Sequence, residues 1–311
     1  MKTGQKVFFT LISLIVLSCS SVQQKSEIVE KRNKAVEYAR YGNDYYSRGM
    51  YDQAVKFFNL ALAYNGTIYY EPGMIESYNS LGKAYLAQGD REAAVTAFNK
   101  ASFLAEKINS NRYKAQCTNN IGELYLADKK IEEALAIFQE ALKYAEAGAP
   151  EAEKAIIYHN LGIAHKRMGD ATTALEYLNK ALFINRNKKL YEEIASNYYI
   201  IAAIYSEKGE YETALMNVRL ALETDKFIEN SLGIAKDYLA LGLISGKAGN
   251  NEEAYEYFKQ DLFVYRSLET IYPDLNVYNE KKEVIGYLID LAGKLGKNDD
   301  VQYYENIKTS L

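Results

Sequence analysis

The chain has 311 residues, of which 48% are apolar, and it contains three prolines and no tryptophan. This composition is typical of a folded protein and excludes a disordered or collagen-like chain. The formal net charge of −4 argues against a protein built to bind the phosphate backbone of nucleic acids.

The first 18 residues are predicted to be a signal peptide and not part of the fold. Lys2 and Lys6 precede an apolar run from Val7 to Leu17, whose 11 residues are too few to span a bilayer as a helix. Ser18 and Cys19 follow this run, and Val-Leu-Ser-Cys resembles a bacterial lipobox, although Leu17 is larger than the residue usual there. The resemblance implies that Cys19 is lipidated and becomes the N-terminus, which would anchor the protein to a membrane. The alternative is an ordinary signal peptide with an incidental cysteine.

Residues 19–31 are polar and are predicted to form a tether that leads into the first helix. From residue 32 to 273, one pattern recurs six times at a period of 40 residues. Each copy predicts two helices, with a small residue on each helix and a large apolar residue one turn after the second small one. The three registers are Gly42, Gly82, Gly122, Gly162, Ala202 and Gly242; Ala54, Ala94, Ala134, Ala174, Ala214 and Ala254; and Phe58, Phe98, Phe138, Leu178, Val218 and Phe258. One such hairpin cannot bury its apolar face alone, so the copies must stack.

The clearest copy reads Tyr78, Leu81, Gly82, Tyr85, Ala94, Phe98 and Ala101. This pattern resembles the tetratricopeptide repeat (TPR), and the long period is similar to that of long-helix variants such as kinesin light chain. The resemblance implies an all-α fold, a TPR solenoid of six helix-turn-helix repeats in a right-handed superhelix.

The repeat register is lost in residues 274–311. One position already departs at Asp261, where the other five copies have alanine, namely Ala61, Ala101, Ala141, Ala181 and Ala221. An amphipathic helix over 275–295 and a short last helix are predicted. Solenoids need an atypical terminal element over the last apolar face, so this segment is expected to supply capping helices. The alternative is a docking site for a partner.

No constellation of catalytic, metal-binding or cofactor-binding residues is visible, so the sequence predicts neither an enzyme nor a cofactor. Cys117 has no histidine near it in sequence and is expected to be a buried packing residue. His165 occupies a register that elsewhere holds tyrosine, which favours a packing role.

The TPR resemblance implies that the first helices line a concave groove that holds a protein or peptide. The predicted partner-binding residues are Asn79, Lys83, Asn119, Asn120, His159, Asn160, Lys166 and Arg167 in a polar half, and Tyr199, Leu239 and Leu243 in an apolar half. Asparagine can bond both N–H and C=O groups of a peptide backbone. The alternative is that exposed first-helix positions are simply polar. The two-carboxylate clamp of co-chaperone TPR domains is not predicted, because only Asn43 matches that pattern.

These features together predict a membrane-anchored scaffold in the cell envelope, on the periplasmic or extracellular side, that binds a partner in its groove. Bacterial TPR lipoproteins of this plan take part in envelope assembly and organisation. Two alternatives stay open. One is a transport component that docks a substrate-binding protein and contributes a ligand path, and the other is a surface adhesin.

Overall fold

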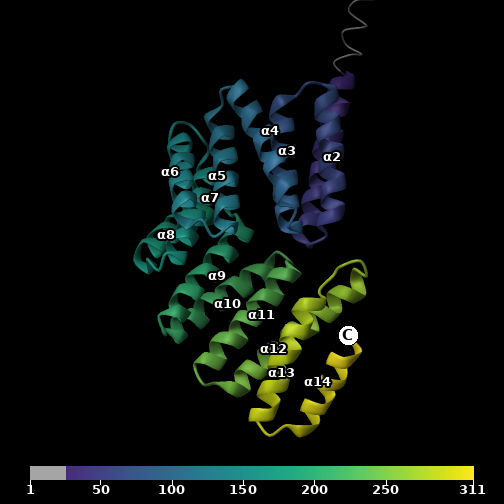
Figure 1. Cartoon of the computed structure of the whole chain (residues 1–311), viewed down its shortest axis with the longest axis vertical. Coiled ribbons are helices and arrows are strands. Elements are labelled where there is room, and N and C mark those ends of the chain that lie inside the picture. Colours follow the sequence, from purple (N-terminus) through teal and green to yellow (C-terminus); the bar gives the residue numbers. More distant parts are fainter. Residues whose placement is uncertain (1–25) are drawn as a thin grey trace, which may run out of the picture. The chain divides into compact units, whose positions relative to one another are not determined.

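The computed structural model describes residues 26–311, which are helical throughout apart from the turns (Figure 1). Contacts divide the chain into two compact units. The first unit holds a helix over residues 26–47, α2 (Tyr51–Thr67), α3 (Glu71–Gln88) and α4 (Arg91–Lys107). The second holds α5 (Asn111–Ala127), α6 (Ile131–Glu146), α7 (Glu151–Arg167), α8 (Ala171–Lys188), α9 (Tyr191–Glu207), α10 (Tyr211–Phe227), α11 (Ser231–Lys247), α12 (Asn251–Ile271), α13 (Tyr278–Lys294) and α14 (Asn298–Ser310). The predicted all-α, TPR-like architecture is therefore confirmed.

Five of the six predicted hairpins close by fitting a large side chain against a glycine, and the fifth hairpin has Ala202 at that position. Phe98 on α4 is fully buried and packs on Gly82 of α3, where a Cβ atom would lie 2.3 Å from the Phe98 ring. Ala94, one turn earlier on α4, is also fully buried. No larger residue fits at Gly82 without moving the ring, so this small–large pair sets the distance between the two helices.

The turns repeat as regularly as the helices. Gly89 ends α3 in the left-handed conformation, with φ +83°. Asp90 then begins α4, because its carboxylate accepts a hydrogen bond from the amide of Ala93 at 3.0 Å. Asp170 caps α8 in the same way. At four of the five junctions between hairpins the positive-φ residue is not glycine, and the positions involved are Tyr69, Asn109, Lys189 and Glu229, whereas the α6–α7 junction has Gly148.

The last helices form a common core with the sixth repeat. Phe258 and Tyr265 of α12 lie in one buried cluster with Val284, Ile285 and Leu288 of α13. This packing covers the apolar side of α12, as a terminal element of a solenoid must.

The first described helix begins earlier than the sequence predicts. Residues 26–31, expected in the tether, are already helical and continue without a break into the first repeat. The signal peptide over 1–18 and the lipidated Cys19 lie outside the described residues, so both stay predictions. Within residues 26–311, no helix combines the length and the apolarity needed to cross a bilayer. Cys117 is buried, as expected of a packing residue.

Candidate functional site

Three neighbouring first helices of the second unit are joined by buried amides. Asn160 on α7 donates hydrogen bonds to Asn119 Oδ1 on α5 at 3.0 Å and to Glu123 Oε1 at 2.9 Å. Asn119 in turn donates to Glu123 Oε1 at 3.0 Å. These side chains close a triangle between α5 and α7, so each amide is held in one orientation.

A second bridge continues from α7 to α9. Asn197 donates to the carbonyl of Glu193 at 2.6 Å, which turns its own oxygen toward His159 Nδ1 at 3.1 Å. Nδ1 must therefore carry the proton, and Nε2 can accept from the Ser196 hydroxyl at 3.4 Å. Burial lowers the pKa of His159, opposed by the hydrogen bond to Asn197, so the ring is neutral at pH 7. We call Asn119, Glu123, His159, Asn160 and Asn197 the first-helix seam.

Two of the three basic residues predicted at this site, Lys166 and Arg167, are also bonded within the chain. Lys166 Nζ lies 2.5 Å from Glu207 Oε1 of α9. Arg167 donates to the main-chain oxygen of Leu126 at 2.6 Å. Both contacts join neighbouring first helices, like the seam itself.

The structure thus brings most of the predicted polar residues together, but not as free groups in an open groove. Asn79, Asn119, Asn120 and Asn160 are all buried, whereas Lys83, His159 and Lys166 are half-buried. The physical reason is the close approach of one first helix to the next, which covers side chains that the periodicity places off the hairpin interface. Their contact with a partner stays a prediction.

The predicted apolar half lies at the C-terminal repeats. Leu239 and Leu243 of α11 are half-buried and pack against the cluster that α12 and α13 share. The side chain of Tyr199 on α9 is half-buried, and burial followed by the charge of Asp237 raises its pKa. The C-terminal helices therefore cover part of the apolar surface that the sequence left without a partner.

Buried carboxyl groups near Tyr199 are the residues that the sequence reasoning missed. Asp225 at the end of α10 and Asp237 on α11 are 5% and 2% exposed, and burial raises the pKa of both. Asn230 donates to Asp225 at 3.0 Å, and Gly233 leaves the room that this carboxylate needs. The 40-residue period could have identified these two positions. The equivalent pair 160 residues earlier is Asn65 and Ser77, hydrogen-bonded at 3.3 Å in the first unit.

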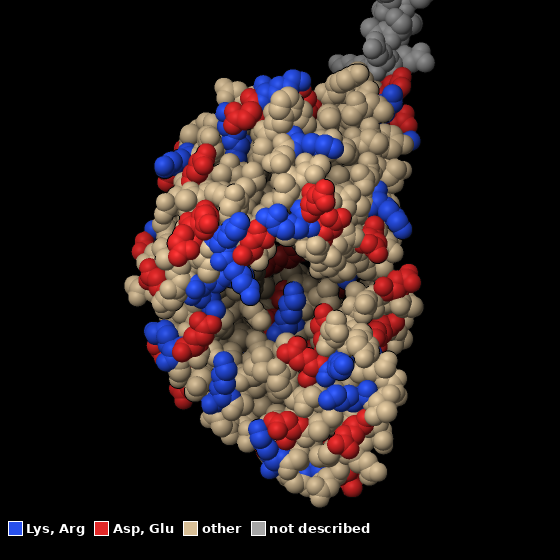
Figure 2. Space-filling model, viewed as in Figure 1, with Lys and Arg blue, Asp and Glu red and all other residues tan. Residues whose placement is uncertain are grey.

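Charges of both signs are mixed over the surface. On the face shown in Figure 2, Lys and Arg side chains lie among Asp and Glu side chains, without a continuous area of one sign. This face therefore offers no single-sign field to a polyanion.

Family models and solved structures match the chain. Two models described as tetratricopeptide repeat match residues 35–107 and 113–187, and residues 195–227, which together exceed half of the 311 residues. A comparison with curated proteins finds no match.

Three solved structures illustrate the likeness in fold. A Rap protein complexed with competence and sporulation factor is 17% identical to this chain. The match covers 92% of this chain and 76% of the Rap chain, with a TM-score of 0.62. The Rap conjugation regulator of plasmid pLS20, in complex with the Phr* peptide, is 20% identical, covers 88% and 74%, and has a TM-score of 0.64. BtubC from P. vanneervenii is 16% identical, covers 76% and 90%, and has a TM-score of 0.56.

Proposed function

The chain belongs to the tetratricopeptide-repeat family, and from this premise we propose that it is a scaffold that binds a protein or peptide along its first helices. We propose no catalytic role. Two of the similar structures are complexes with a factor or a peptide. The likeness at 17% and 20% identity concerns the fold, so binding by this chain is argued from its own residues.

The observation that carries the proposal is the first-helix seam. Its buried amides hold three consecutive first helices, α5, α7 and α9, in register, and this presents His159 and Lys166 on α7 and Tyr199 on α9 as half-buried polar groups. Groups that are held before binding lose little conformational entropy when a partner arrives. An extended segment laid across these helices would meet two such groups on α7 and one on α9.

Site-specific photo-cross-linking tests this placement. A photoreactive phenylalanine analogue at Tyr199, on the first helix α9, is expected to capture the partner in cells. The matched control is the same analogue at Phe183, which is 69% exposed on the second helix α8 and should capture no partner. Cross-links from position 183 alone would place the partner on the second helices and overturn the proposal.

We further propose that the scaffold is held at a membrane through a lipid on Cys19 and works in the cell envelope, on the periplasmic or extracellular side. The support is the short apolar run that ends at Ser18 and Cys19. An adhesin must be exposed on the cell surface, so survival of the protein when protease is added to intact cells would rule out that alternative.

One observation favours the alternative that the protein is a transport component: the apolar surface around Leu239 and Leu243. Changing both to serine should leave partner capture intact if the polar repeats hold the partner. Loss of capture in this variant, with capture retained when the seam asparagines are replaced, would favour the transport component.

A further inference from the structure

In three of the repeats, an aromatic ring of the second helix packs on aromatic rings of the first helix. In the fourth repeat, the Tyr177 ring of α8 stacks on two rings of the preceding first helix. Its centroid lies 6.0 Å from that of Tyr158 and 5.5 Å from that of His165. Lys180 completes the arrangement, with its ammonium 5.1 Å from the Tyr177 centroid and 6.0 Å from that of Tyr158. Such stacks are favourable beyond the area that they bury.

The first repeat has the same arrangement with a different ring. Phe57 of α2 lies 6.2 Å from Tyr38 and 5.2 Å from Tyr45, measured between centroids. In the sixth repeat, Tyr257 lies 6.4 Å from Tyr238. A ring on the second helix is thus a recurring partner for the aromatic residues of the first helix.

The second repeat has this frame without the central ring. Tyr78 and Tyr85 of α3 stand where Tyr158 and His165 stand, and the Lys100 ammonium is 5.6 Å from the Tyr78 centroid. Asp90 caps α4 as Asp170 caps α8. At the position of Tyr177, however, the chain has Ala97.

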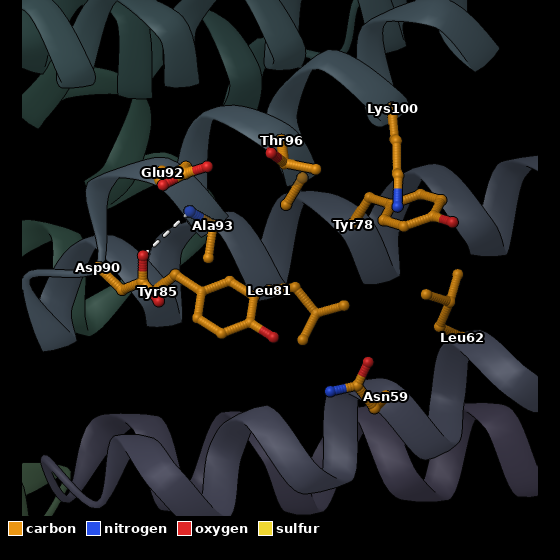
Figure 3. Close-up of a pocket in the computed structure, with 11 residues that line it drawn as sticks. Asn59, Leu62, Tyr78, Leu81, Tyr85, Asp90, Glu92, Ala93, Thr96 and Lys100 are labelled. Carbon is orange, nitrogen blue, oxygen red and sulfur yellow. Dashed lines mark hydrogen bonds between the residues drawn. The ribbon is translucent and has the colours of Figure 1, made fainter.

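The missing ring leaves an open hollow of about 440 Å³ in the first unit. Tyr78, Leu81 and Tyr85 of α3 lie against it, with Lys100 of α4 above Tyr78 (Figure 3). On the other side, Asn59 and Leu62 of α2 line the hollow. We call this hollow the repeat-two slot.

The chemistry of the slot is that of a site for one flat ring. Its floor is aromatic and aliphatic, the Lys100 ammonium stands at one end, and Asp90 and Glu92 line the other end (Figure 3). Asn59 occupies the place that Arg219 has in the fifth repeat, where Arg219 Nη2 lies 3.4 Å from the Tyr257 hydroxyl of the next repeat. A phenol in the slot would therefore meet an amide where Tyr257 meets a guanidinium.

We propose that the repeat-two slot receives a phenylalanine or tyrosine side chain of a partner polypeptide, which takes the place that Phe57, Tyr177 and Tyr257 fill in their own repeats. A single free ring buries little surface against the entropy lost on association, so alone it should bind only weakly, and stable binding needs a larger molecule with further contacts. The slot lies on the α2–α4 side of α3, in a different unit from the first-helix seam. The proposal therefore does not depend on binding at the seam.

The test fills the slot from within. Ala97→Phe restores the ring that other repeats have there, and the matched control Ile137→Phe adds a ring at the equivalent position of the third repeat. There Thr118 stands where the slot has Tyr78, so an added ring could meet only Tyr125 and the stack on two rings cannot form. The probes are N-acetyl-tyrosinamide and N-acetyl-phenylalaninamide, with N-acetyl-leucinamide as the non-aromatic comparison, and binding is followed by saturation-transfer NMR. We expect both aromatic amides to bind the wild type and the control, and to bind Ala97→Phe at least tenfold more weakly.

A second arm tests the source of the ring. Peptides selected from a display library on the wild type, and counter-selected on Ala97→Phe, should share a phenylalanine or tyrosine. Aromatic amides that bind without any such peptide would mean a small aromatic ligand and overturn the polypeptide assignment. Equal binding of the leucine amide, unchanged binding to Ala97→Phe, or a melting temperature of Ala97→Phe well below that of the wild type would each show that the hollow is not shaped for a ring.

Discussion

Replacing Asp261 by alanine should make the protein more stable, and more so as the pH rises. Asp261 stands where the other repeats have Ala61, Ala101, Ala141, Ala181 and Ala221. Its residue is fully buried, and neither carboxyl oxygen has a hydrogen-bond partner. Burial, and secondarily the charge of Glu283 on α13, raises the pKa of Asp261 to about 8.

The sign of the pH effect follows from the direction of this pKa shift. A carboxyl whose pKa is raised on folding from 3.8 to about 8 is most favourable to the folded state below pH 3.8. That contribution is lost progressively as the pH rises from 3.8 through about 8, because in this range the carboxyl group is ionised in the unfolded chain but still protonated in the folded one. Each unit between those limits corresponds to about 1.4 kcal/mol, which gives a ceiling of about 4 kcal/mol at pH 7. The small void left by the carboxyl group offsets part of the gain, so about 2 kcal/mol is a realistic expectation.

Thermal unfolding of the wild type and Asp261→Ala at pH 5, 7 and 8.5 measures this effect. At about 2–4 °C per kcal/mol, the melting temperature should rise by about 4–8 °C at pH 7, and the difference should grow with pH. Asp290→Ala is the control, because Asp290 is an exposed residue of α13 paired with Lys294. A loss of stability in Asp261→Ala, or a gain that is the same at every pH, would refute the reasoning.

Three further predictions concern the repeats and the N-terminus. Ala174 is fully buried, so Ala174→Leu should lower the melting temperature by an amount equivalent to about 1–3 kcal/mol, whereas Lys180→Ala, which removes only solvent-exposed contacts to Tyr177 and Glu176, should lower it much less; equal shifts would mean a wrong register. Asn119→Ala with Asn120→Ala should weaken partner capture in a pull-down several-fold or more, and lower the melting temperature as well, because both amides are buried; unchanged capture would remove the seam from the site. Labelled palmitate should enter the wild type and not Cys19→Ala, which should leave the membrane fraction; a labelled variant would rule out lipidation there.

The predicted site residues show how far periodicity reaches. Helical spacing placed Asn119 and Asn160 off the interface within their own hairpins, and in the structure their hydrogen bonds lie within α5 or between α5 and α7. It did not reveal that Asn160 bonds Asn119 and Glu123 across 3.0 Å and 2.9 Å. Those contacts join residues 41 and 37 positions apart, and a period of about 40 alone does not state how closely consecutive repeats approach.

The missing ring of the second repeat illustrates the same division. The sequence contains every residue of the slot, including Ala97 where other repeats have an aromatic side chain. That substitution means a hollow only once the stacking of Tyr177 on Tyr158 and His165 is known from the structure. A hollow can be identified only when the side chains that surround it are placed, and here they come from three different helices.

By itself, the sequence determined the helices, their pairing and the close fit within each pair. Local signals suffice for this, because a small residue such as Gly82 and a large one such as Phe98 lie 16 positions apart in one hairpin. Only the tertiary structure decided which polar groups are covered by a neighbouring repeat and which stay accessible. Burial of a side chain depends on every helix that surrounds it, and those helices come from residues that no single period specifies.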